Sequence, residues 1–148
     1  MDRRFPLIVR IVLGVFGVID VATGLWAVLK PEKWFSDFPG AGRHWVAASG
    51  GPYNEHLVVD AGAGFLAVGV ALVVAAVWME RRVVQCALAV LLAHSVPHFL
   101  HHVTSDATDK MSTFDKLNGV YSLGLQAVVA IAFLVLIARR PVRELYMR

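Results

Sequence analysis

Four long runs of apolar residues constrain this chain more than any other feature. They cover about residues 7–29, 56–79, 83–103 and 114–138. A helix rises about 1.5 Å per residue, so the first run of roughly 23 residues spans about 34 Å, enough to cross the hydrocarbon core of a bilayer. We therefore expect one all-α domain over residues 1–148, an integral membrane bundle of four antiparallel helices.

The composition agrees with a membrane protein and argues against other classes. Apolar residues make up 57% of the chain and charged residues 17%, which is typical of membrane proteins. The net charge is +3, but the basic residues flank the apolar runs and form no patch with aromatic residues, so we expect no nucleic-acid partner. Asp20 interrupts the first run, which favours a retained helix over a cleaved signal peptide.

The arginines predict which way the helices face. They gather at the N-terminus, between the second and third runs, and in the tail, whereas the other two connections carry mostly lysine. The positive-inside rule therefore places both termini in the cytoplasm, and the expected location is a bacterial inner membrane. The arginines on the inner side are Arg3, Arg4, Arg10, Arg81, Arg82, Arg139, Arg140, Arg143 and Arg148.

Local signals predict how the connections and helix ends are built. The longest connection, residues 30–55, is rich in aromatic residues; we expect it to lie on the lipid headgroups, and a sharper hypothesis makes it a lid over a site. Asn54 is the expected N-cap of the second helix. Ser112 with Asp115 has the form of a capping box before the fourth helix.

Glycines recur at seven-residue spacing in the first two runs. Gly17 and Gly24 lie in the first run, and Gly62 and Gly69 lie in the second. Small residues on one stripe of a helix let a neighbouring backbone approach closely. We expect tight packing within one bundle, and a dimer face is the alternative.

Polar residues of the four runs gather in the outer half of the predicted bundle. Ionisable residues at membrane depth indicate a functional site by default, because they are costly to keep there. Counted from the inner end, Asp20, His94 and Gln126 share one level, where they could form a helix tie or a proton path. The residues further out are His56, Asp60, His98, His101, His102, Asn118 and Tyr121.

The outer group suggests a metal site. Imidazoles and a carboxylate are ordinary ligands of zinc, iron or copper. His56 and Asp60 share one face of the second helix, and His98 and His101 share one face of the third. These four are the predicted ligands. The residues expected to hydrogen-bond them are Glu55, Asn118, Tyr121 and His102.

Two other hypotheses remain open beside a metal-dependent oxidoreductase or hydrolase. The first is a redox subunit that binds haem b or contacts quinone, with His56 and either His98 or His101 as the axial pair and Gly62 and Gly64 lining the slot. The second is a scaffold or assembly subunit, within a membrane redox complex or a homo-oligomer, in which the histidines only tie helices together.

Two short motifs resemble known membrane proteins. The segment His98-Phe99-Leu100-His101-His102 resembles a histidine box of membrane fatty-acid desaturases and hydroxylases, which combine several boxes around a diiron centre; this chain has one such box. The segment Pro52-Tyr53-Asn54-Glu55-His56-Leu57, with Asp60, Gly62 and Pro97-His98, resembles small bacterial four-span proteins that are DoxX-like in size and hydropathy. The second resemblance implies a membrane partner of redox enzymes.

Overall fold

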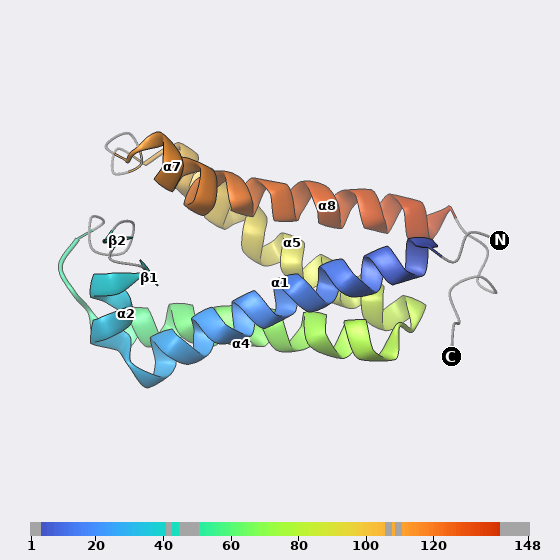
Figure 1. Ribbon diagram of the computed structural model, residues 1–148, viewed down its shortest axis with the longest axis horizontal. Helices are drawn as coiled ribbons and strands as arrows, with labels where there is room; N and C mark the ends of the chain where they lie inside the picture. Colours follow the sequence, from blue (N-terminus) through green and yellow to red (C-terminus); the bar gives the residue numbers. More distant parts are fainter. Residues whose placement is uncertain (1–3, 41–42, 45–50, 106–107, 109–110, 140–148) are drawn as a thin grey trace.

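Four long helices make up most of the computed structural model, which describes residues 4–40, 43–44, 51–105, 108 and 111–139. They are α1 (Arg4–Leu29), α4 (Glu55–Trp78), α5 (Arg81–Val103) and α8 (Tyr121–Ala138) (Figure 1). Each of the four is long and apolar enough to cross a membrane. The protein is therefore all-α and fits a multi-pass membrane protein, as the four apolar runs predict.

The shorter elements lie at one end of the long helices. They are α2 (Pro31–Asp37), the paired strands β1 (Pro39–Gly40) and β2 (Arg43–His44), α7 (Thr113–Asp115) and the π-helical turn η1 (Lys116–Val120). We call this the α2 end. The start of α1, the α4–α5 turn and the end of α8 lie at the opposite end, which we call the Met79 end (Figure 1).

The predicted helix caps are confirmed. The Asn54 side chain accepts a hydrogen bond of 3.2 Å from the Leu57 N–H at the start of α4. The Ser112 hydroxyl accepts one of 3.2 Å from the Asp115 N–H. The fourth helix differs from the expected continuous helix over 114–138, because α7 passes into the π turn η1 and regular α-helix begins only at Tyr121. Gly119, a poor helix former, lies within that turn.

The α4–α5 connection is shorter and earlier than the predicted turn at residues 80–82. Met79 adopts a left-handed conformation (φ 52°) that ends α4, and α5 already begins at Arg81. The Arg81 guanidinium donates a hydrogen bond of 3.4 Å to the carbonyl of Ala138 at the end of α8. A cation at a helix C-terminus is favourable, so this bond joins α5 to α8 at the Met79 end.

The glycine spacing marks the contact between α1 and α4, as predicted. A Cβ atom added to Gly24 would lie 2.5 Å from the backbone nitrogen of Leu66, and one added to Gly69 would lie 2.5 Å from that of Val21. Gly17 approaches Gly69 and Val73 in the same way. Only glycine permits this approach, so the two backbones touch along most of their length.

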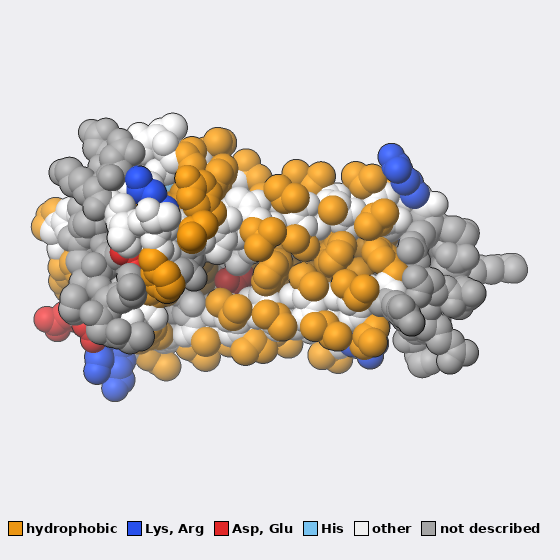
Figure 2. Space-filling model, turned by 45° about the horizontal axis from the view of Figure 1, so that its top comes forward, with side chains coloured by type: hydrophobic (Ala, Val, Ile, Leu, Met, Phe, Trp, Pro, Cys, Tyr) orange, Lys and Arg blue, Asp and Glu red, His pale blue; other side chains and the backbone are white. Residues whose placement is uncertain are grey.

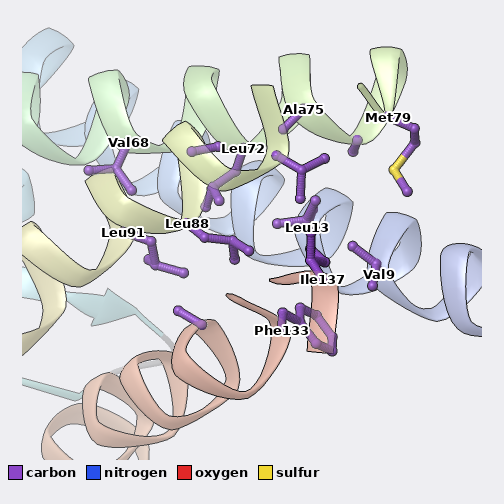
Figure 3. Close-up of a cluster of buried hydrophobic side chains, with 14 residues drawn as sticks. Val9, Leu13, Val68, Leu72, Ala75, Met79, Leu88, Leu91, Phe133 and Ile137 are labelled. Carbon is purple, nitrogen blue, oxygen red and sulfur yellow. The ribbon is translucent and has the colours of Figure 1, made fainter. Parts of the chain in front are cut away.

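The hydrophobic core lies in the half of the molecule near the Met79 end, where all four helices meet (Figure 3). Leu13 of α1, Leu72 of α4 and Leu91 of α5 are fully buried there. α8 completes the core, and its Phe133 ring packs edge to face against Phe5, with centroids 6.2 Å apart. This core leaves the half near the α2 end to be filled by other residues.

Part of that half is filled by aromatic residues of α2 and its flanks. Trp34 is buried against Ala27 and Val58, with Trp26 and Phe38 packed around it. These residues cover the ends of α1 and α4. Residues 45–50 of the predicted lid lie outside the described residues.

Candidate functional site

The interior face of α5 changes from apolar to polar at its middle. Its buried residues recur every three or four positions, so they form one stripe along the helix. Near the Met79 end the stripe is apolar and belongs to the hydrophobic core. Towards the α2 end Ser95 is fully buried, His98 is half-buried and His102 is 9% exposed. The whole stripe is Val84, Leu88, Leu91, Ser95, His98 and His102.

The interior stripe of α1 is apolar except at one residue. Val9 and Leu13 are buried in the core, and Ala27 is buried nearer the α2 end. Asp20 lies on this stripe and is only 3% exposed. The carboxyl group therefore faces protein rather than the surroundings of the helices.

The helix register places Asp20 and the start of the polar stripe at similar heights. Gly17 lies opposite Gly69 and Val73, and Gly24 lies opposite Gly62 and Leu66, so Asp20 lies level with residues near Val68 of α4. Phe65, one turn away, packs against both His94 and His98, with ring centroids 4.8 Å and 5.9 Å apart. The height difference is about one helical turn, roughly 5 Å.

The imidazoles of α5 form a ladder that leads towards the α2 end. The ring centroids of His94 and His98 are 5.4 Å apart, and those of His98 and His102 are 4.8 Å apart. His101 touches the last of these rings at 5.6 Å but is itself exposed. The rings of His94, His98 and His102 therefore follow one another along α5.

Three buried polar atoms at this level have no hydrogen-bond partner among the residues that the structure describes. They are Oδ2 of Asp20, Nε2 of His94 and Oγ of Ser95. Buried polar groups are normally satisfied, and leaving one unpaired costs about 1–3 kcal/mol. The predicted tie between Asp20 and His94 is thus not made through these atoms. Figure 2 shows an acidic side chain recessed in a hollow among hydrophobic side chains.

We call Asp20, His94, Ser95, His98 and His102 the interior polar site. An imidazole can donate and accept hydrogen bonds at once, and a carboxyl group can exchange a proton with it. The combination is suited to acid–base exchange and to holding a polar group of a ligand.

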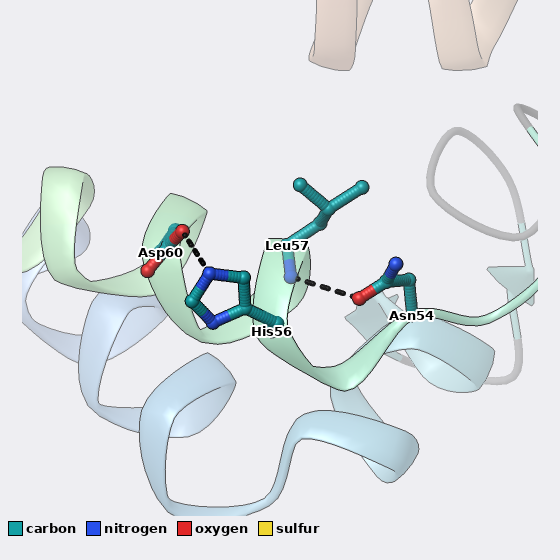
Figure 4. A network of polar contacts seen from close by, with 4 residues as sticks. All are labelled: Asn54, His56, Leu57 and Asp60. Atoms are coloured by element: carbon teal, nitrogen blue, oxygen red, sulfur yellow. Dashed lines mark hydrogen bonds and ion pairs between the residues drawn. The ribbon is translucent and has the colours of Figure 1, made fainter.

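The predicted metal ligands are not assembled as one group. His56 and Asp60 pair with each other, one turn apart on α4, with Nε2 and Oδ2 3.4 Å apart (Figure 4). Their side chains are 85% and 62% exposed. His98 faces the interior and His101 is exposed. Among the residues that the structure describes, no three His, Cys, Asp or Glu side chains lie close enough to hold a metal ion.

The residues predicted to support those ligands are also dispersed. Glu55 and Tyr121 are exposed. Gln126, which was predicted at the level of Asp20 and His94 instead, is half-buried on α8. The Asn118 side chain lies outside the described part of the chain. His102, expected only to assist, is the buried member of the His101–His102 pair.

The two glycines proposed for a haem slot differ in their surroundings. A Cβ atom on Gly62 would lie 2.7 Å from Ala27, so this glycine is used by the α1–α4 contact. Gly64 borders open space, because a Cβ atom there would meet nothing within 4 Å. His56, the predicted axial ligand on α4, pairs with Asp60 on its own helix.

Sequence reasoning missed Ser95 and Phe65. The seven-residue spacing of Val84, Leu91 and His98, and of Leu88, Ser95 and His102, was the signal that could have found the stripe. Phe65 carries no sequence signal, because one aromatic residue among many apolar ones does not reveal what it touches.

Comparison with known proteins finds no matching family model, no matching curated protein and no matching solved structure. The desaturase-like and DoxX-like resemblances stay predictions. The function is therefore inferred from the interior polar site.

Proposed function

We propose that this protein spans the membrane as an antiparallel bundle and carries an acid–base site in the outer half of the bilayer. The Met79 end faces the cytoplasm in this proposal, because the arginine-rich segments belong to that end. The interior polar site then opens towards the outside. Its function is to bind a molecule and to exchange protons with it.

The observation that carries the proposal is the coincidence of two interior stripes. Asp20 on α1 and Ser95, His98 and His102 on α5 occupy positions where apolar residues continue the core elsewhere on the same helices. Histidines that merely lie at the level of the lipid headgroups would face outward, as His56 does. Buried ionisable groups persist in membrane helices where they serve function.

The arrangement gives each residue a role. Asp20 and His94 lie deepest and would contact the bound molecule, while His98 and His102 connect them to the outer surface. Each imidazole can accept a proton at one nitrogen and release one from the other. Beyond Asp20 the four helices are sealed by the apolar core, so protons have no continuation to the Met79 end.

Carbodiimide labelling in oriented proteoliposomes tests the proposal. N,N′-dicyclohexylcarbodiimide modifies protonated carboxyl groups in apolar surroundings, and peptide mass spectrometry locates the product. We expect the rate of Asp20 modification to fall when the buffer at the α2 end is made alkaline. The pH of the buffer at the Met79 end should not change this rate. The proposal is wrong if Asp20 does not react, or if its rate of modification changes with the pH at the Met79 end.

Two adjacent histidines supply the matched variants for this test. His102→Phe replaces the buried ring of the ladder, whereas His101→Phe replaces an exposed ring beside it. We expect the first variant to lose the response of Asp20 to outer pH and the second to keep it. Equal behaviour of the two variants contradicts the ladder.

A metal site is the second candidate, favoured by His98 and His102. Their rings lie one turn apart with centroids 4.8 Å apart, and a histidine pair at this spacing on a helix is a common zinc-binding arrangement. The metal needs further ligands beyond this pair. Elemental analysis of the purified protein tests this candidate. Stoichiometric zinc, iron or copper that is lost in His98→Ala supports a metal site, and a metal-free wild-type protein contradicts it.

A further inference from the structure

The four long helices form two tight pairs. α1 and α4 are joined through their glycines, and this contact continues to Gly24 and Gly62 near the α2 end. α5 and α8 are in contact there through a side chain, because a Cβ atom on Gly124 would lie 3.0 Å from the Phe99 ring. Neither pair opens within itself towards the α2 end.

The two pairs separate from each other towards the α2 end. Val68 and Ala75 of α4 are buried in the core, and Gly64 lies on the same side of this helix, one turn beyond Val68. Yet a side chain at Gly64 would meet nothing within 4 Å. Figure 1 shows α5 and α8 diverging from α1 and α4 in this direction, and Figure 2 shows the hollow on one face.

The walls and the floor of this space differ in chemistry. Phe65, Val68 and the helix surfaces around them are apolar, which suits a hydrocarbon chain. Deeper between the helix pairs, Oδ2 of Asp20, Nε2 of His94 and Oγ of Ser95 are buried without partners among the described residues. Asp20 and Ser95 are more than nine-tenths buried, so a head group reaches them only after neighbouring side chains move aside.

We propose that this space binds a membrane-soluble amphiphile with an uncharged hydroxyl or carbonyl head. The inference rests on the proposed function and names the class of molecule that the acid–base site serves. The head hydrogen-bonds Asp20, His94 and Ser95, and the apolar chain lies between the two helix pairs. An anionic head is disfavoured by the carboxyl group of Asp20, and no lysine or arginine is buried among the described residues to compensate it.

Photo-crosslinking in proteoliposomes tests the inference. The probe is a long-chain alcohol with a diazirine in its chain and a terminal alkyne, and the control is the matching alkane without the hydroxyl group. We expect the alcohol to label segments 62–68 and 94–102, and unlabelled alcohol to compete this labelling away. The alkane should label only exposed apolar residues such as Ile11 and Val15.

Two glycine variants are matched for this experiment. Gly64→Leu fills the space between the helix pairs, and Gly14→Leu adds the same side chain to α1, where a Cβ atom also meets nothing within 4 Å. We expect Gly64→Leu to lose the competable labelling and Gly14→Leu to keep it. Labelling that does not saturate, or that survives in Gly64→Leu, overturns the inference.

The carbodiimide reaction separates this inference from the proposed function. If the rate of Asp20 modification still changes with the pH at the α2 end while the alcohol shows no saturable labelling, only the inference of amphiphile binding is wrong. If the response of Asp20 is absent as well, the acid–base site itself is wrong. Helix content and thermal unfolding that match those of Gly14→Leu show that the Gly64→Leu variant is folded.

Discussion

At the scale of single residues, the stability of an Asp20 variant distinguishes a binding site from a structural tie between helices. A tie stabilises the fold, whereas an unpartnered buried group destabilises it. We predict that Asp20→Leu raises the free energy of unfolding by about 1–3 kcal/mol, because it removes a buried polar atom that has no partner. Reversible unfolding in mixed detergent micelles measures this difference.

The control for that prediction is Asp60→Leu, on α4. The Asp60 side chain is 62% exposed, and substitutions at exposed positions usually change stability by no more than about 0.5 kcal/mol. A marked loss of stability in Asp20→Leu would show that Asp20 is a tie, and would favour the scaffold hypothesis.

The histidines divide into two groups by accessibility. His56 and His101 are exposed, whereas His94 has a buried Nε2 and His102 is 9% exposed. We predict that diethylpyrocarbonate modifies the first pair about tenfold faster than the second, because the buried rings react only after local opening. Peptide mass spectrometry over a time course measures both rates, and equal rates would contradict the interior placement.

The sequence located the histidines but could not tell which of them face inward. It predicted His98 and His101 on one face, and the structure places His98 and His102 together in the ladder. Positions three and four residues ahead both fall near one face of a helix, so spacing alone does not separate His101 from His102. The partner helix makes that choice, through contacts such as Phe65 with His98.

At the scale of elements, the glycine spacing determines how closely α1 and α4 pack. We predict that Gly24→Ala destabilises the fold by about 1–3 kcal/mol, because its Cβ atom would overlap the Leu66 backbone at 2.5 Å. Gly14→Ala, with open space around it, should instead stabilise α1 by about 0.5–1 kcal/mol. Unfolding of both variants under the same conditions tests this, and equal effects would place the contact elsewhere.

Helix boundaries were predictable where local chemistry decides them. Asn54 and Ser112 cap their helices as expected, because their side chains bond the nearby backbone N–H groups. The π turn before Tyr121 and the left-handed Met79 were not predicted. Met79 adopts a left-handed conformation that residues other than glycine rarely take, so its residue type did not predict it.

The whole molecule has a sealed half and a polar half. The core from Val9 to Ile137 closes the Met79 end, and the interior polar site occupies the rest. We predict that proteoliposomes containing the protein show no more proton flux than empty liposomes when a pH gradient is imposed, with a pH-sensitive dye inside as the reporter. Flux that disappears in Asp20→Asn would identify a proton pathway through the bundle and contradict the sealed core.

The orientation of the α5 stripe is the claim on which the rest depends, and spin-label accessibility tests it most directly. In a Cys86→Ser background, single cysteines at Ser95, His98 and His102 are compared with cysteines at Val96, Leu100 and Val103, which are exposed. We predict that oxygen dissolved in the bilayer collides rarely with labels at the first three positions and often with labels at the other three. The opposite pattern would turn the histidines towards lipid and leave no interior polar site.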